Sequence, residues 1–169
     1  MTDTAALAPD VRARVEEIST VGYTILPDVF DADRAAAMRD KIREIEATTL
    51  RPMEEGETEA DSSFFRTAGL LRIDPMFWDV PIDPQVTAVV EGALGEDFLL
   101  STFSGIDLKP KSGNIQPLHP DDALVPFPRP HSQPIGCTAM WVLTPFGPAT
   151  GGTRLLPGSQ AGSAMSESR

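Results

Sequence analysis

A short polar stretch, QPLHPDD over Gln116–Asp122, contains one of only two histidines in the chain. On an extended strand, side chains two positions apart project from the same face, so His119 and Asp121 could reach one ion while Asp122 points away. One imidazole and one carboxylate suit an ion such as iron(II), and a second histidine would complete a 2-His-1-carboxylate facial triad. The H-x-D pattern is short, however, and an ordinary polar turn also explains it.

Helical patterns dominate the part of the chain that precedes this stretch. The first predicted helix has three apolar residues at helical spacing, namely Val11, Val15 and Ile18. Asp31 is a suitable N-cap for a second helix over residues 32–48. One apolar stripe of that helix should face the core: Ala35, Met38, Ile42 and Ile45. A third helix is predicted over residues 83–95, begun by Asp-Pro and stopped by Gly.

Strand patterns are fewer at first and then become dominant. Residues 23–26 and 64–73 each predict a strand, and from residue 98 onward β-type runs occupy residues 98–110, 135–146 and 151–157. Gly- and Pro-rich loops separate these later runs. Helices followed by strands indicate an α+β fold in which helices flank a sheet or barrel.

The charge, the cysteine count and the lack of long apolar runs exclude several classes of binding partner and site. The formal net charge is -11 and the sequence pI is about 4.5, so the surface should repel nucleic acid and anionic membranes. Cys137 is the only cysteine, which excludes an intramolecular disulfide and a cysteine-based zinc cluster. No signal peptide is evident, and no apolar run approaches the roughly 18 residues of a membrane span. We therefore expect a cytoplasmic protein with no nucleic-acid or membrane partner.

An ordered series of short patterns surrounds the histidine. The series is Leu108-Lys109-Pro110, Gln116-x-x-His119-x-Asp121, Met140-Trp141 and Gly151-Gly152-Thr153-Arg154-x-x-Pro157-Gly158-Ser159. It resembles the phytanoyl-CoA dioxygenase family, and GYTILPDVFDADRAAAMRDKI near the N-terminus resembles the first strand and helix of that family. The resemblance implies N-terminal helices packed on a double-stranded β-helix (jelly roll), incomplete in this chain. It also implies an oxygenase that depends on iron(II) (Fe²⁺) and 2-oxoglutarate.

The resemblance implies roles for five residues. His119 and Asp121 resemble the first two iron ligands of the family. Lys109 resembles a lysine near 2-oxoglutarate, although a surface lysine is the alternative, and Trp141 resembles a tryptophan of the co-substrate pocket, with core packing as its alternative. Gln116 would support the ligands. With dioxygen, such an enzyme couples the decarboxylation of 2-oxoglutarate to hydroxylation of a small organic substrate, whose identity stays open.

The chain also departs from the family pattern. The family's third ligand is a histidine well beyond the Pro-Gly-Ser turn, followed by an arginine that binds 2-oxoglutarate, but this chain ends ten residues after Ser159. His131 lies 12 residues after His119 in a Pro-rich loop, where we expect a surface position or a substrate contact. Gln160 also stands where the family usually has a histidine.

These departures leave two hypotheses. The chain is either the N-terminal part of a longer oxygenase or a non-catalytic jelly-roll module, completed by self-association through exposed sheet edges. A cupin-type isomerase would require more than two histidines. We expect one oxygenase-like domain over residues 1–160, with a helical and strand part over 1–97, a partial jelly-roll core over 98–160 and a polar, disordered tail over 161–169.

Overall fold

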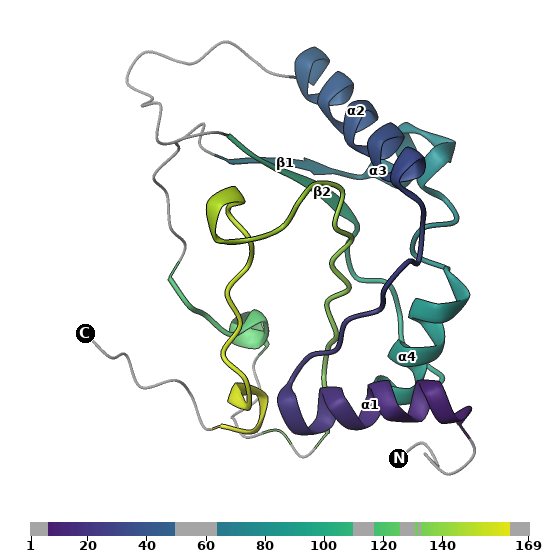
Figure 1. The fold of residues 1–169 in the computed structure, drawn as a ribbon, viewed down its shortest axis with the longest axis vertical. Helices are drawn as coiled ribbons and strands as arrows, with labels where there is room; N and C mark the ends of the chain where they lie inside the picture. Colours follow the sequence, from purple (N-terminus) through teal and green to yellow (C-terminus); the bar gives the residue numbers. More distant parts are fainter. Residues whose placement is uncertain (1–6, 50–63, 110–116, 126–130, 132, 163–169) are drawn as a thin grey trace.

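The computed structural model describes residues 7–49, 64–109, 117–125, 131 and 133–162 (Figure 1). Its helices and strands follow one another in this order: α1 (Pro9–Val21), α2 (Ala32–Thr49), β1 (Phe64–Ala68), α3 (Leu70–Ile73), 3-10 helix η3 (Pro75–Phe77), α4 (Pro84–Leu94), β2 (Ser104–Leu108), and the 3-10 helices η4 (Asp121–Leu124), η5 (Pro148–Thr150) and η6 (Ser159–Ala161). The fold is therefore α+β, as predicted.

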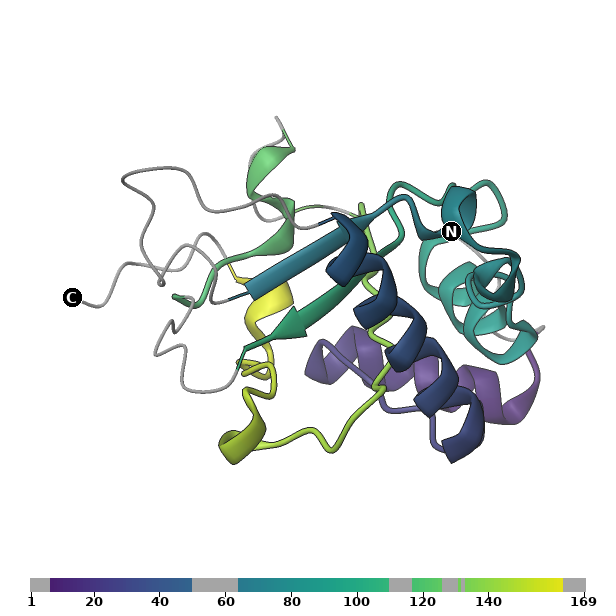
Figure 2. The same ribbon diagram turned by 90° about the horizontal axis from the view of Figure 1, so that it is seen from above.

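Two packing units form this fold (Figures 1 and 2). Helix α2 lies on a two-stranded sheet, in which β1 and β2 pair antiparallel from Phe64 opposite Leu108 to Ala68 opposite Ser104. Helix α1 packs against α4. A late segment of the chain returns to the C-terminal end of α1, where the Gly158 amide donates a hydrogen bond of 2.8 Å to the Val21 carbonyl.

The hydrophobic core lies between α2 and the segments that follow β1. Its buried residues are Met38, Ile42, Ile45, Leu70, Phe77 and Val80. Three of the four residues in the predicted α2 stripe are among them, which confirms that this face of α2 points inward. Phe77 also meets Phe103 edge to face, with ring centroids 6.4 Å apart.

A glycine in β2 sets how closely α2 approaches the sheet. A Cβ atom at Gly105 would lie 2.9 Å from Cδ1 of Ile42, closer than real Cβ contacts. The missing side chain therefore lets the Ile42 side chain rest directly on the strand backbone.

The predictions for helices are confirmed. Residues 9–21 form α1, and the Asp31 carboxylate accepts a hydrogen bond of 2.7 Å from the Arg34 amide at the start of α2. Asp83 caps α4 in the same way, accepting from the amides of Gln85 and Val86. Short-range signals explain this agreement, namely the proline that starts α1 and the caps at Asp31 and Asp83, because they need only residues that are neighbours in the sequence.

The predictions for strands are only partly right. The predicted strand over 64–73 is β1 followed by α3, divided at Gly69, where φ is 71°. The prediction for residues 98–110 holds for Ser104–Leu108. Those for 23–26, 135–146 and 151–157 are wrong, since these segments carry no strand. A strand requires a hydrogen-bonded neighbour, and the sheet among the described residues contains only β1 and β2. The jelly roll therefore stays a prediction.

None of the helices described by the structure is long and apolar enough to cross a membrane.

Candidate metal site

The H-x-D pair lies where an extended segment turns into a 3-10 helix. Pro120 is extended (φ -79°, ψ 137°), and Asp121 begins η4. The strand assumed for His119–Asp121 is therefore wrong, because the chain turns immediately after the proline. The two side chains nevertheless meet, with Nε2 of His119 3.8 Å from Oδ1 of Asp121.

The second polar atom of each side chain is already hydrogen-bonded. Nδ1 of His119 lies 2.9 Å from the Pro117 carbonyl oxygen, which can only accept, so Nδ1 carries the proton. In a neutral imidazole, Nε2 is then the acceptor. The Thr138 hydroxyl donates to Oδ2 of Asp121 at 3.0 Å. With the imidazole neutral, the remaining atoms Nε2 and Oδ1 face one another as two acceptors, an arrangement that a cation or a bridging donor would stabilise; with the imidazole protonated, they form an ion pair.

The spacing is compatible with one shared metal ion after a small adjustment. Metal bonds of about 2.1 Å at a right angle place neighbouring ligand atoms about 3 Å apart. Closing the gap from 3.8 Å is feasible for these side chains, because His119 is 55% and Asp121 72% exposed. Among the described residues no group of three or more His, Cys, Asp or Glu side chains could hold a metal. The described part of the chain thus brings together the pair His119 and Asp121 and no larger group of this kind.

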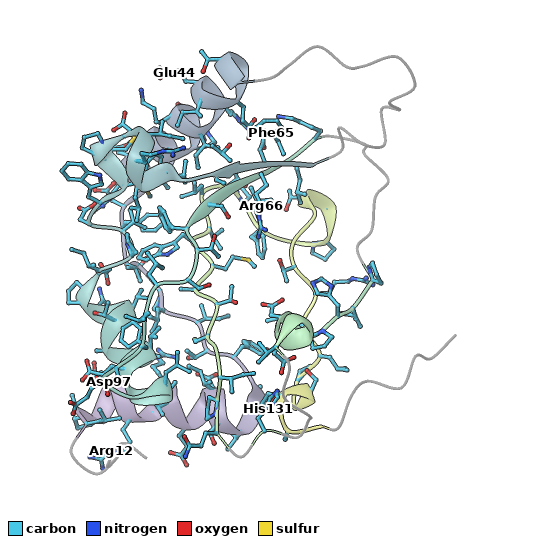
Figure 3. All side chains as sticks on the ribbon, turned by 180° about the vertical axis from the view of Figure 1, so that it is seen from behind. Arg12, Glu44, Phe65, Arg66, Asp97 and His131 are labelled. Atoms are coloured by element: carbon cyan, nitrogen blue, oxygen red, sulfur yellow. The ribbon has the colours of Figure 1, made fainter. Side chains whose placement is uncertain are left out.

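The other histidine belongs to a different pair. Nε2 of His131, labelled in Figure 3, lies 2.7 Å from Oδ2 of Asp122. Both side chains are largely buried, with exposed fractions of 14% and 15%. Of the two positions expected for His131, a fully exposed place on the loop is not observed, and a substrate contact stays a prediction. Asp122 is turned to His131 while its neighbour Asp121 faces His119, so adjacent carboxylates serve different partners.

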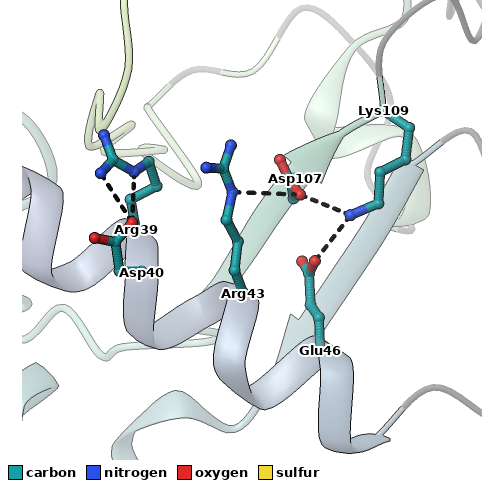
Figure 4. A network of polar contacts seen from close by, with 6 residues as sticks. All are labelled: Arg39, Asp40, Arg43, Glu46, Asp107 and Lys109. Atoms are coloured by element: carbon teal, nitrogen blue, oxygen red, sulfur yellow. Dashed lines mark hydrogen bonds and ion pairs between the residues drawn. The ribbon is translucent and has the colours of Figure 1, made fainter.

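Lys109 lies in a cluster that joins α2 to β2 (Figure 4). Its ammonium contacts Oδ2 of Asp107 at 2.7 Å and Oε2 of Glu46 at 3.0 Å. Arg43 approaches the same Asp107 oxygen at 3.9 Å. The Glu46 side chain is only 3% exposed, and its Oε1 has no hydrogen-bond partner among the described residues.

Two pKa values in this cluster are displaced. Burial raises the pKa of the Glu46 carboxyl, and the Lys109 ammonium opposes that rise. The pKa of Lys109 is also raised, chiefly by its hydrogen bond to Asp107. The Lys109 ammonium therefore already compensates the negative charge of two carboxylates, Glu46 and Asp107, within the fold.

Trp141 is anchored in the core. Its ring stacks on Phe30 with centroids 5.4 Å apart and an interplanar angle of 18°. Trp141 and Leu143 are partly buried against the core cluster, whereas Val142 between them is exposed. These contacts support the core-packing alternative for Trp141. Gln116 lies outside the described residues.

The sequence analysis did not identify Thr138 or Glu46 as relevant residues. Glu46 had a detectable signal, because it follows Ile42 by one helical turn and so shares the apolar face of α2. Thr138 had none, since it is separated from Asp121 by 17 residues and only the folded chain brings the two together.

Comparison with known proteins agrees with the patterns around His119. The profile of the family described as Phytanoyl-CoA dioxygenase (PhyH) matches residues 18–169. Two curated relatives are the uncharacterized proteins Mb1539 of Mycobacterium bovis and Rv1501 of Mycobacterium tuberculosis, each 27% identical over 157 residues. Each match covers 85% of this chain and 54% of the relative, so the chain spans about half the length of these relatives. No solved structure matches the chain significantly.

Proposed function

This chain belongs to the phytanoyl-CoA dioxygenase family, and we propose on that premise that it forms the iron-binding part of an oxygenase dependent on iron(II) and 2-oxoglutarate. The substrate class we propose is a small organic molecule, hydroxylated at an unactivated C–H bond. The domain would comprise residues 1–160, built on a jelly roll of the kind the family resemblance implies.

One observation carries the proposal. Nε2 of His119 and Oδ1 of Asp121 face each other at 3.8 Å while the other polar atom of each side chain is hydrogen-bonded to the protein. Such outer hydrogen bonds are typical of metal ligands, because they select the histidine tautomer and orient the carboxylate.

In the proposed enzyme, two residues would bind the iron and three others would lie near the co-substrate. His119 would bind the ion through Nε2 and Asp121 through Oδ1. Iron(II) held by few protein ligands would supply the open coordination positions at which 2-oxoglutarate and dioxygen react. Gln116, Lys109 and Trp141 stay proposed neighbours of the co-substrate by family resemblance. For Lys109 the two carboxylates it contacts favour a structural task instead.

An anaerobic titration tests the proposal. Iron(II) and 2-oxoglutarate would be added to the purified chain while the charge-transfer absorption of their complex is followed, and succinate would be measured after oxygen is admitted. We expect a saturable band that His119→Ala abolishes. His131→Gln is the matched control, because it alters the other histidine and should retain the band. A wild-type chain without band or succinate would overturn the proposal, as would tight binding that survives His119→Ala.

A second candidate is a non-catalytic module completed by another copy or segment. The observation that favours it is a group of exposed large apolar side chains on β2 and on the later extended segments: Ile106, Leu108, Met140, Val142, Leu155 and Leu156. Within the described part, the outer edges of β1 and β2 also have no neighbouring strand. Sedimentation over a range of concentrations would distinguish the candidates, since this one predicts self-association without iron binding.

A further inference from the structure

We propose that Thr138 is a positioning residue of the candidate iron site, which keeps the Asp121 carboxylate bound to metal through a single oxygen. This inference rests on the proposed function and adds a residue that neither the H-x-D pattern nor its spacing indicates. Its starting point is the hydrogen bond of 3.0 Å from the Thr138 hydroxyl to Oδ2 of Asp121.

The chemistry depends on how many positions the carboxylate occupies. A carboxylate can bind a metal through one oxygen or through both. If both Asp121 oxygens bound, one of the positions needed for co-substrate and dioxygen would be lost. The Thr138 hydroxyl occupies Oδ2 and so leaves Oδ1, the oxygen that faces Nε2 of His119, as the free ligand atom.

Thr138 is itself exposed, and its hydrogen bond to Asp121 lies at the surface, but the segment that carries it reaches the core a few residues later. Thr138 lies three residues before Trp141, whose ring stacks on Phe30 against the core. Asp121 itself is 72% exposed at the start of a 3-10 helix of four residues. The hydroxyl therefore links the exposed Asp121 carboxylate to a segment that attaches to the core at Trp141, three residues further on.

The two ligands are supported in complementary ways. The Pro117 carbonyl accepts from Nδ1 of His119 and directs Nε2 toward the pair, and that support is local in sequence. Support for Asp121 comes from a distant segment through Thr138. Loss of the hydroxyl should release the carboxylate to rotate, which lowers metal affinity without removing a ligand.

Two substitutions at Thr138 isolate its hydroxyl, and one at Thr153 is the control. Thr138→Val keeps the shape and removes the hydroxyl, whereas Thr138→Ser keeps the hydroxyl and removes a methyl group. Thr153→Val is the matched control, because the Thr153 hydroxyl contacts the Met140 sulfur at 3.4 Å. The Thr153→Val substitution also removes a threonine hydroxyl but leaves the hydrogen bond from Thr138 to Asp121 intact.

The measurement is the dissociation constant of cobalt(II) and of anaerobic iron(II), determined by titration of each intact chain with its melting temperature recorded alongside. Loss of an outer-shell partner weakens metal binding by about 10- to 100-fold, so we expect Thr138→Val to bind at least about tenfold more weakly. Thr138→Ser should bind within about twofold of wild type, given that it preserves the same outer-shell hydrogen bond. Thr153→Val should equal wild type. The melting temperatures should agree among all four proteins.

The outcomes separate this inference from the function it rests on. If wild type binds neither metal, both the proposed function and the role of Thr138 are wrong. If wild type binds and Thr138→Val binds equally well, only the role of Thr138 is wrong. Should Thr138→Val unfold, the comparison of Thr138→Ser with Thr138→Ala decides in its place, and equal affinities in that pair would overturn the inference.

Discussion

Replacing Lys109 with Met tests the cluster between α2 and β2. The substitution keeps much of the aliphatic stem and removes the ammonium that contacts Glu46 at 3.0 Å and Asp107 at 2.7 Å. Glu46 would then hold its charge at a site where its side chain is 3% exposed. We expect the folded state to be destabilised, because a buried carboxylate has lost its cation.

The expected magnitude is moderate. Breaking a fully buried ion pair by removing one partner costs about 3–5 kcal/mol. Lys109 is 39% exposed, however, so water screens the pair and compensates for part of the loss. With that discount we expect a cost of about 1–2 kcal/mol. For a chain of this length the loss should lower Tm by about 2–8 °C.

The pH dependence has a definite sign. Burial raises the pKa of Glu46 in the folded state above its ordinary value of 4.5, and Lys109 opposes the rise. Removing Lys109 should therefore raise that pKa further. A group whose folded pKa is raised favours folding below its unfolded pKa, and that contribution is lost as pH rises through the folded pKa. The destabilisation by Lys109→Met should be largest near neutral pH and should shrink as pH falls toward the ordinary glutamate pKa.

Urea unfolding of four proteins measures this effect: wild type, Lys109→Met, Glu46→Gln and the double variant, each from neutral to mildly acidic pH. In the double variant the buried charge is absent, so Lys109→Met should cost less there than in wild type. An equal cost in both backgrounds, or a cost independent of pH, would refute the reasoning. A variant of unchanged stability that loses 2-oxoglutarate binding would instead assign Lys109 to the co-substrate.

Three further substitutions test the capping and close packing of the fold, each by urea or thermal unfolding. Asp31→Ala should lower stability by about 1 kcal/mol through loss of the α2 cap, with Asp31→Asn as the control that retains an acceptor. Gly22→Ala should be destabilising for two reasons: Gly22 ends α1 at φ 97°, and a Cβ there would lie 2.5 Å from Oε1 of Gln160. Adding Gln160→Ala should remove the clash but leave the cost of the positive φ. Gly105→Ala should also destabilise through the 2.9 Å approach to Ile42, and an additive effect with Ile42→Ala would contradict that contact.

Local features of this chain were predictable from its sequence. The helices over 9–21 and 84–94 and the caps at Asp31 and Asp83 followed from neighbouring residues. The family followed from an ordered series of short patterns, which the profile match over residues 18–169 confirms. The proximity of His119 and Asp121 was also predictable, although the strand geometry offered as its reason was wrong.

The remaining features required contacts between distant segments. Residues 135–146 have strand-like composition but no strand, because the sheet formed by the described residues provides no neighbour for them. Glu46 and Lys109 meet across 63 positions, and Thr138 reaches Asp121 across 17. The sequence by itself determined the helices, their caps, the family and the two candidate ligands. The tertiary structure alone decided that Thr138 contacts Asp121 and that Lys109 lies between Glu46 and Asp107, because pairing across a fold depends on how helices and strands pack.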